Sequence, residues 1–254
     1  MIDIHCHILP GLDDGPVTDE ESLDMAKAAV KEGIKTIIAT PHHRNNKYEN
    51  KREQILKNVS KLNELLKKEK IPLEILPGQE NRIYGEILED YLKGEILTLS
   101  NTQYLFIEFP TSSVPRYAER LLYDIQVEGI TPIIVHPERN KEILENPDLL
   151  YNFVKKGSLT QVTAASVTGY FGKNIQKFSK QLIEANLTHF IASDAHNIHN
   201  RTFKLNEAYN YIEDIIGKDY VYLFMENSES ILSNENIFRE IPEKLRKKKF
   251  FGIF

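Results

Sequence analysis

The chain opens with a run in which two histidines could bind a metal ion. Residues 3–7, Asp-Ile-His-Cys-His, read as an apolar β-strand that starts almost at residue one. In a strand, residues i and i+2 point to the same side, so His5 and His7 share a face and Cys6 points away. Two neighbouring imidazoles form half of a metal site, although a pair alone is as often a structural or surface feature. The metal hypothesis therefore depends on where further ligands lie.

Side chains of the metal-binding type follow most of the other predicted strands. We predict strands at residues 1–5, 36–40, 73–76, 104–109, 131–135, 158–163 and 189–192. The candidates at their ends are His5, His7, His42, Glu80, Glu108, His136, Asp194 and His196. The carboxyl ends of parallel strands in a barrel meet at one rim, so we expect these side chains to lie together. Solvated loop residues would have no reason to choose the same end of nearly every strand.

The first loop adds two aspartates, of which we prefer Asp14 as a ligand and keep Asp13 in reserve. With one of them there are about nine candidates, enough for two or three ions with bridging carboxylates. The set mixes imidazole and carboxylate groups without thiolate. It suits Mn²⁺, Fe, Mg²⁺ or Zn²⁺ in a multinuclear catalytic site rather than a closed structural zinc site.

Strands alternate with predicted helices along the whole chain. Helices are expected near residues 18–32, 49–69, 85–92, 115–128, 149–156, 172–186, 203–216 and 218–233, the first with Thr18 and Glu21 as a capping box. Alternation of this kind indicates an α/β fold with parallel strands and crossover helices. We predict a single domain over residues 1–254, a closed (β/α) barrel of about seven strands. An open doubly wound sheet would show the same alternation, but the first loop lacks the glycine pattern of nucleotide-binding folds.

Composition narrows the class of protein. The net charge of −5 argues against a general nucleic-acid binder. The single cysteine, Cys6, allows no disulfide framework within the chain and fits a reducing compartment, so we expect a cytoplasmic protein. A thiol-based tyrosine phosphatase needs Cys-x5-Arg, and the position six residues after Cys6 is Leu12.

Several motifs together resemble one family. The runs MIDIHCHILPGLDDGP, ATPHH, GQE, IEFP, HPERN and ASDAHN resemble the polymerase-and-histidinol-phosphatase (PHP) superfamily. Within it the chain looks like the manganese-dependent protein-tyrosine phosphatases of bacterial capsule and exopolysaccharide loci. The resemblance covers almost the whole chain and implies a distorted, TIM-like (β/α) barrel with three Mn²⁺ ions. It also implies that the protein substrate is an autophosphorylated tyrosine kinase that regulates polysaccharide export, so any membrane contact would be indirect, through that kinase.

The resemblance also implies a role for each motif residue. One ion would be held by His5, His7, Glu80 and Asp194, a second by Glu80, Glu108 and His136, and a third by Asp14, His42 and His196. Arg139 and Arg201 match the arginines that hold the substrate phosphate, whereas an arginine taken alone more often forms a surface salt bridge. Residues 161–166 read QVTAAS, where similar proteins more often read QVNAGS, and Asn81 replaces a frequent apolar residue.

The residues support hydrolysis of a phosphate monoester. Clustered cations lower the pKa of bound water toward ~7, which supplies hydroxide for attack on phosphorus. A phenolate with a solution pKa of ~10 leaves without much help from an acid, and His43 or His199 would be the acid if one is needed. The alternatives are a small-molecule phosphatase acting on a compound such as histidinol phosphate, a nuclease or proofreading domain, and a non-catalytic docking module.

The basic and aromatic residues 244–254 are expected to form a solvated helix end with phenylalanines packed on the barrel. Contact with a membrane surface or an acidic kinase tail is the alternative.

Overall fold

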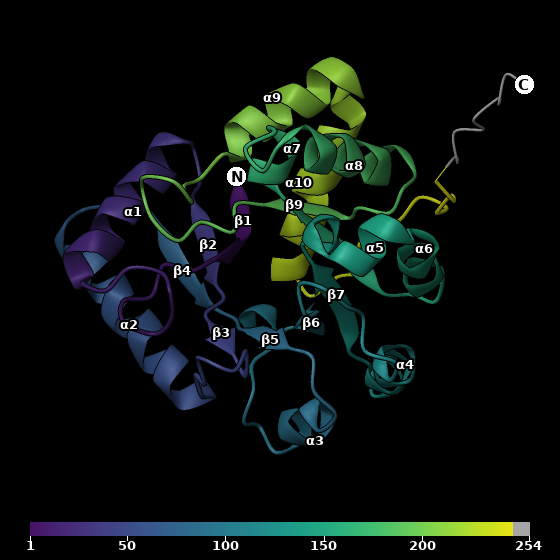
Figure 1. The fold of residues 1–254 in the computed structure, drawn as a ribbon. Coiled ribbons are helices and arrows are strands. Elements are labelled where there is room, and N and C mark those ends of the chain that lie inside the picture. Colours follow the sequence, from purple (N-terminus) through teal and green to yellow (C-terminus); the bar gives the residue numbers. More distant parts are fainter. Residues whose placement is uncertain (246–254) are drawn as a thin grey trace, which may run out of the picture.

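The computed structural model describes residues 1–245, in which strands and helices alternate as predicted (Figure 1). The strands are β1 (Ile2–Cys6), β2 (Thr36–Ala39), β3 (His42–His43), β4 (Glu74–Pro77), β5 (Glu80–Arg82), β6 (Tyr104–Glu108), β7 (Thr131–Val135), β8 (Leu159–Thr163) and β9 (Phe190–Ala192). The helices are α1 (Asp19–Lys31), α2 (Arg52–Lys68), α3 (Ile87–Leu92), α4 (Ala118–Val127), α5 (Lys141–Glu145), α6 (Asp148–Lys155), α7 (Ala164–Val167), α8 (Lys173–Glu184), α9 (Leu205–Ile215) and α10 (Lys218–Leu232). Two short 3-10 helices, η1 (Leu99–Asn101) and η2 (Pro137–Arg139), complete the set.

The strands form two parallel sheets, with the orders β1-β2-β4 and β3-β5-β6-β7-β8-β9. In Figure 1, α1 and α2 flank the smaller sheet, and α4 to α9 lie on the side of the larger one. The α/β class and the parallel strands are confirmed, whereas closure into one barrel is not. The predicted count of about seven strands was too low, because β3 and β5 are only two and three residues long and carry no apolar run. The single domain over residues 1–254 stays a prediction.

Alternate residues of the strands pack into two different cores. One cluster contains Ile4, Ile38, Leu99, Tyr104, Phe106, Ile133, Val135, Leu159, Phe190, Ala192, Ile231 and Ile237. The cluster joins Ile231 of α10 with side chains from strands of both sheets, and α10 contacts β1 of one sheet and β9 of the other. The neighbouring strand residues Ile37, Ile107 and Ile191 belong to a second, larger cluster that includes the buried faces of the helices. This period-two alternation buries both faces of the strands, as expected for parallel sheets.

Backbone hydrogen bonds link the last strand to the first. The Asp194 N–H donates to the His5 carbonyl at 2.9 Å, and the His7 N–H donates to the Ala195 carbonyl at 2.9 Å. The buried Asp3 carboxylate accepts from the Ser193 N–H at 3.0 Å in the same region. These contacts place the ends of β1 and β9 side by side, so residues as far as 190 positions apart in sequence become neighbours.

Local signals located the helices well. The Thr18 side chain accepts from the Glu21 N–H and the Glu21 side chain accepts from the Thr18 N–H, so the capping box that starts α1 is confirmed. The short α5 and α7 were not predicted, because four or five residues are too few to show helical periodicity. Within the described part of the chain, every helix is too short or too polar to cross a membrane. The predicted packing of the C-terminal phenylalanines falls on residues 246–254, outside the described residues.

Candidate metal centre

The strand ends bring all nine predicted ligands into one network of polar contacts. His42 of β3 and Glu80 of β5 are direct register partners in parallel strands, so their side chains lie next to each other. Glu108 is the last residue of β6 and His136 follows β7. His42 and Glu80 were expected after the ends of strands; they lie instead in the extra strands β3 and β5.

Nitrogen and oxygen atoms of four side chains converge near the ends of β1 and β9 and the start of β5. The Nε2 atom of His7 lies 3.3 Å from Nε2 of His5, 3.4 Å from Oε2 of Glu80 and 3.5 Å from Oδ1 of Asp194. The Nε2 atom of His5 lies 3.6 Å from Oε1 of Glu80 and 3.5 Å from the same Asp194 oxygen. All four side chains are buried.

The other ring nitrogens of the two histidines already have acceptors. Nδ1 of His5 lies 2.9 Å from Oε1 of Gln161, and Nδ1 of His7 lies 2.7 Å from Oδ2 of Asp13. With Nδ1 protonated, both Nε2 atoms present lone pairs to the carboxylate oxygens. Buried lone pairs that face one another need a cation between them, so these residues fit a metal ion.

Two further groups of possible ligands adjoin the first. Oδ1 of Asp14 lies 3.4 Å from Nε2 of His42 and 3.3 Å from Nε2 of His196. Glu80 contacts Nδ1 of His42 at 2.6 Å and Nε2 of His136 at 2.8 Å. The groups whose ligand atoms lie mutually close enough for one ion are His7–Asp14–His42–His196, His5–His7–Glu80 and His42–Glu80–Glu108.

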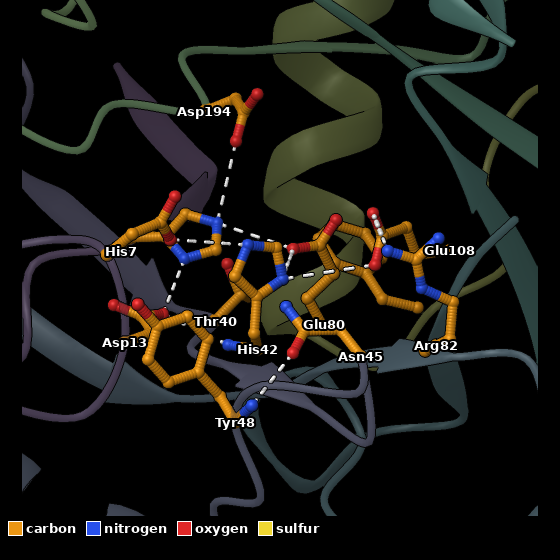
Figure 2. A network of polar contacts seen from close by, with 12 residues as sticks. His7, Asp13, Thr40, His42, Asn45, Tyr48, Glu80, Arg82, Glu108 and Asp194 are labelled. Atoms are coloured by element: carbon orange, nitrogen blue, oxygen red, sulfur yellow. Dashed lines mark hydrogen bonds and ion pairs between the residues drawn. The ribbon is translucent and has the colours of Figure 1, made fainter. Parts of the chain in front are cut away.

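This grouping resembles the predicted division into three ions, with three differences. Asp194 lies close to His5 and His7 but is not part of a group. His7 and His42 each belong to two groups, and His136 contacts Glu80 but is not in the group of Glu108. Figure 2 shows His7 between Asp194 and Asp13, with Glu80 beyond His42 on the side of Glu108 and Arg82. Glu80 touches four imidazoles and is fully buried, as expected for a bridging carboxylate.

The carboxylates and imidazoles shift one another's pKa values strongly. Burial opposes ionisation of Glu80, but His42 and His5 lower its pKa well below the usual range. Burial, together with the Glu80 charge, raises the pKa of Glu108 to about 7. Burial, together with Arg139, lowers the pKa of His136 to about 4, and burial, together with His7, lowers that of His196 to about 4. Burial opposes protonation of His7 and His42, but Asp13 raises the pKa of His7 well above its usual value and Glu80 raises that of His42 to about 10. Metal ions bind the uncharged imidazole, so metal binding would release protons from these two histidines.

The two predicted arginines lie beside the carboxylates of the network. One terminal nitrogen of Arg139 lies 2.6 Å from Oδ2 of Asp194. Arg201 lies 3.0 Å from Oδ2 of Asp14 and 3.6 Å from Oδ1 of Asp194. Both arginines line a cavity of about 200 Å³, whose wall also contains His42, Glu108, Phe109, Thr111, Val135, His136, Pro137, Asn140 and Asp194. The cavity therefore combines two cations with apolar surface.

Two of the candidate ligands have a left-handed backbone conformation. His136 has φ +36° and Asp194 has φ +53°, conformations that L-residues with side chains rarely adopt. His136 directly follows β7, and Asp194 lies two residues after the end of β9. Strained residues of this kind persist where the surrounding contacts hold them, and they cluster at functional sites.

Several polar residues at the site were not singled out from the sequence as contributors. Arg82 forms an ion pair with Glu108 at 3.1 Å, and the fully buried Glu138 accepts from the Ser166 hydroxyl at 2.6 Å. Gln161 contacts Nδ1 of His5. The sequence analysis noted residues 161–166 as a motif but assigned no role to Gln161. Arg82 lies two residues after Glu80, and this period-two spacing on β5 was the signal available for it.

The remaining chemical candidates lie apart from the cluster's centre. The Cys6 thiol is buried, lies 3.5 Å from the Ala195 carbonyl oxygen, and has its pKa raised by burial, so it is not an activated nucleophile. His43 is buried, with its ring 6.4 Å from that of Tyr84. His199 is exposed and lines a second cavity, of about 310 Å³, together with Asp14 and His196. A role for either histidine as an acid stays a prediction.

Comparison with known proteins points to one family. The family "Capsular polysaccharide synthesis, CpsB/CapC" matches residues 1–233. Tyrosine-protein phosphatase YwqE of Bacillus subtilis is 52% identical over 254 residues, which are 100% of this chain and of that protein. Tyrosine-protein phosphatase CpsB of Streptococcus agalactiae is 34% identical over 243 residues, covering 93% of this chain and 100% of that protein.

A solved structure agrees with these relatives. It belongs to work on YwqE from Bacillus subtilis and CpsB from Streptococcus pneumoniae, described as unique metal-dependent tyrosine phosphatases. Its TM-score against the present structure is 0.95 at 51% identity, covering 97% of this chain and 100% of that chain. The agreement therefore extends over nearly the whole fold.

Proposed function

This chain belongs to the CpsB/CapC family of capsular polysaccharide synthesis, and we propose that its clustered ligands are the catalytic metal centre of a tyrosine-protein phosphatase. The chain is a metal-dependent enzyme that hydrolyses phosphotyrosine in proteins. The observation that carries the assignment of the centre is the convergence of lone pairs from His5, His7, Glu80 and Asp194 beside two arginines. That arrangement offers both a site for cations and a site for a phosphate.

We assign the ligands to three ions. His5, His7, Glu80 and Asp194 would hold the first, Glu80, Glu108 and His136 the second, and Asp14, His42 and His196 the third. Mn²⁺ is the cation we propose, since imidazole mixed with carboxylate suits it, with Fe, Mg²⁺ and Zn²⁺ as alternatives. When bound, such ions supply Lewis acidity and lower the pKa of bound water toward ~7.

The chain's own cations would position the phosphate. Arg139 and Arg201 each have a guanidinium group next to a proposed ligand, Asp194 or Asp14. A phosphate bound between them would displace part of these ion pairs and accept hydrogen bonds from the guanidinium groups. The donors would then lie where negative charge develops on the phosphoryl oxygens, which lowers the barrier to transfer.

The cavity also suits an aromatic ester. Phe109, Val135 and Pro137 share its wall with the arginines and give the phenyl ring an apolar surface. The leaving phenolate has a solution pKa of ~10, so proton donation to it is less demanding than to an aliphatic alcohol. This arrangement favours phosphotyrosine over a small polar phosphate ester such as histidinol phosphate.

The protein substrate that we propose is an autophosphorylated bacterial tyrosine kinase. The support is the family's description, which connects these proteins with capsular polysaccharide synthesis. The cytoplasmic location and the indirect membrane contact remain part of this proposal. A kinase phosphorylated in vitro should lose its phosphotyrosine when mixed with the full chain and metal ions, and a kinase that keeps its phosphate would contradict the proposed partner.

Metal removal and replacement test the centre directly. The protein is stripped with chelator and assayed on a phosphotyrosine peptide, a phosphoserine peptide and histidinol phosphate, with Mn²⁺, Mg²⁺ or Zn²⁺ added back. We expect Mn²⁺ to restore hydrolysis of the phosphotyrosine peptide, and His7→Gln to prevent this restoration. Full activity of the stripped protein, or a preference for histidinol phosphate, would contradict the proposal.

A further inference from the structure

Asp13 directs both carboxylate oxygens at N–H groups of the candidate metal centre. Oδ2 lies 2.7 Å from Nδ1 of His7 and accepts from the His42 N–H at 3.0 Å. Oδ1 accepts from the Gly15 N–H at 3.0 Å. The side chain is almost completely buried, at 1% exposure. Figure 2 shows it on the side of His7 opposite to Asp194.

The two adjacent aspartates of this loop have different environments. Asp14 is 38% exposed and directs Oδ1 at the Nε2 atoms of His42 and His196. Asp13 instead contacts the Nδ1 side of His7, away from the atoms that converge. The loop allows this because Gly15 has no side chain: a Cβ there would lie 2.3 Å from the His7 carbonyl oxygen and 3.1 Å from Oδ1 of Asp13.

We propose that Asp13 is a positioning residue for the metal centre and is not itself a ligand. Its carboxylate holds the proton of His7 on Nδ1, which leaves the Nε2 lone pair directed at the ions. The same oxygen fixes the backbone at the start of β3, the strand that carries His42. This inference rests on the proposed metal centre, and it assigns a separate role to the aspartate that the sequence left as a reserve ligand.

The position of His7 makes this contact important for more than one ion. His7 belongs to both the His5–His7–Glu80 group and the His7–Asp14–His42–His196 group. A carboxylate on the far ring nitrogen fixes the orientation of an imidazole ligand and raises its basicity, and loss of such a partner typically weakens metal binding about 10- to 100-fold. Asp13 should therefore affect two of the proposed ion positions: the first through its ligand His7, and the third through its ligand His42, whose N–H donates to Asp13.

His5 provides an internal comparison. Its Nδ1 contacts Oε1 of Gln161 at 2.9 Å, a neutral amide in place of a carboxylate. Both contacts select the same tautomer, but only Asp13 adds a negative charge next to its histidine. The chain thus orients its two adjacent histidine ligands by different means, and Asp13 supplies the stronger one.

Asp13→Asn is the variant that tests this role. Asparagine has one acceptor oxygen, so it cannot accept from Gly15 on one side and from His7 and His42 on the other. Mn²⁺ binding to the full chain is measured by electron paramagnetic resonance, which reports the free ion. We expect about 10- to 100-fold weaker binding, with the wild-type number of ions still bound at saturating Mn²⁺.

Two matched variants separate the possible explanations. Asp24→Asn removes the charge of an aspartate on α1 that is 52% exposed, and should leave Mn²⁺ binding unchanged. Asp14→Asn removes a proposed ligand and should reduce the number of bound ions by one. If Asp13→Asn also binds one ion fewer, Asp13 is a ligand and the proposal is wrong; unchanged affinity in Asp13→Asn overturns it equally.

The tautomer of His7 can also be observed in the wild-type chain. Long-range ¹⁵N–¹H spectra of the Zn²⁺-loaded protein report which ring nitrogen carries the proton, and His7→Gln assigns the signal. A proton on Nδ1 of His7 is expected, and its absence would contradict the proposal even if Asp13→Asn does not fold. Neither measurement depends on phosphatase activity, so failure of the proposed function and failure of this inference give different results.

Discussion

His189 should make the stability of this protein depend on pH in a way that one substitution removes. The imidazole is buried and its Nδ1 accepts a hydrogen bond from the Thr160 N–H at 3.1 Å. Protonation of Nδ1 would put an N–H donor opposite the Thr160 N–H donor. It would also place a positive charge in the core. Burial, with a smaller contribution from Arg239, therefore lowers the pKa of His189 to about 3.

The sign and size of the effect follow from linkage. Unfolded histidine has a pKa of about 6.5, so below that pH the unfolded chain binds a proton that the folded chain refuses. The contribution of uncharged His189 to the free energy of unfolding is complete above pH 6.5 and is lost as the pH falls toward 3. Each pH unit in this window is worth about 1.4 kcal/mol, so stability should fall by about 2 kcal/mol between pH 6.5 and pH 5 from this residue alone.

Urea unfolding of the wild type and of His189→Asn, both stripped of metal, provides the assay. Asparagine can place an oxygen near the position of Nδ1, and the packing that it loses is independent of pH. The wild type should therefore lose about 2 kcal/mol more than the variant between pH 7.5 and pH 5. The metal-centre residues titrate equally in both chains, so their effect cancels in the difference between the two free energies of unfolding. Parallel pH profiles for the two chains would refute the reasoning.

Three further results are expected. Gly15→Ala should lower the free energy of unfolding by about 2 kcal/mol or more, since the new Cβ would lie 2.3 Å from the His7 carbonyl oxygen. Gly85→Ala, with no atom within 4 Å, is the matched control, and an equal loss there would contradict this account. Cys6→Ala should leave hydrolysis of a phosphotyrosine peptide unchanged, because the thiol is buried and not activated; a large loss of kcat would implicate it. Arg139→Lys should lower kcat/KM for that peptide about 10- to 100-fold, because lysine cannot form the guanidinium fork, and an unchanged value would remove Arg139 from the phosphate site.

Much of this protein was predictable because its signals are local. The capping box of Thr18 and Glu21 marks the start of α1, and apolar runs mark seven of the nine strands among residues 1–245. Parallel strands align their carboxyl ends, so side chains far apart in sequence could be expected to meet. The family was recognisable because its motifs lie at those strand ends, where the chemistry restricts which residue types can occur.

Other features depend on contacts that leave no local pattern. The strands β3 and β5 are too short for periodicity and exist because His42 and Glu80 pair across parallel backbones. The division of the strands into two sheets depends on which backbone groups pair, and alternation of strands and helices is compatible with several such arrangements.

The sequence by itself determined the alternating α/β order, the residue types at each strand end and the exclusion of thiol chemistry. Only the tertiary structure decided what the two adjacent aspartates do. Asp13 and Asp14 are the same residue type at neighbouring positions, and their sequence surroundings do not distinguish a ligand from a positioning residue. The tight turn at Gly15 sends one carboxylate to Nδ1 of His7 and the other toward Nε2 of His42 and His196. The direction of a side chain in a loop is set by the groups that surround it, and those groups come from distant parts of the chain.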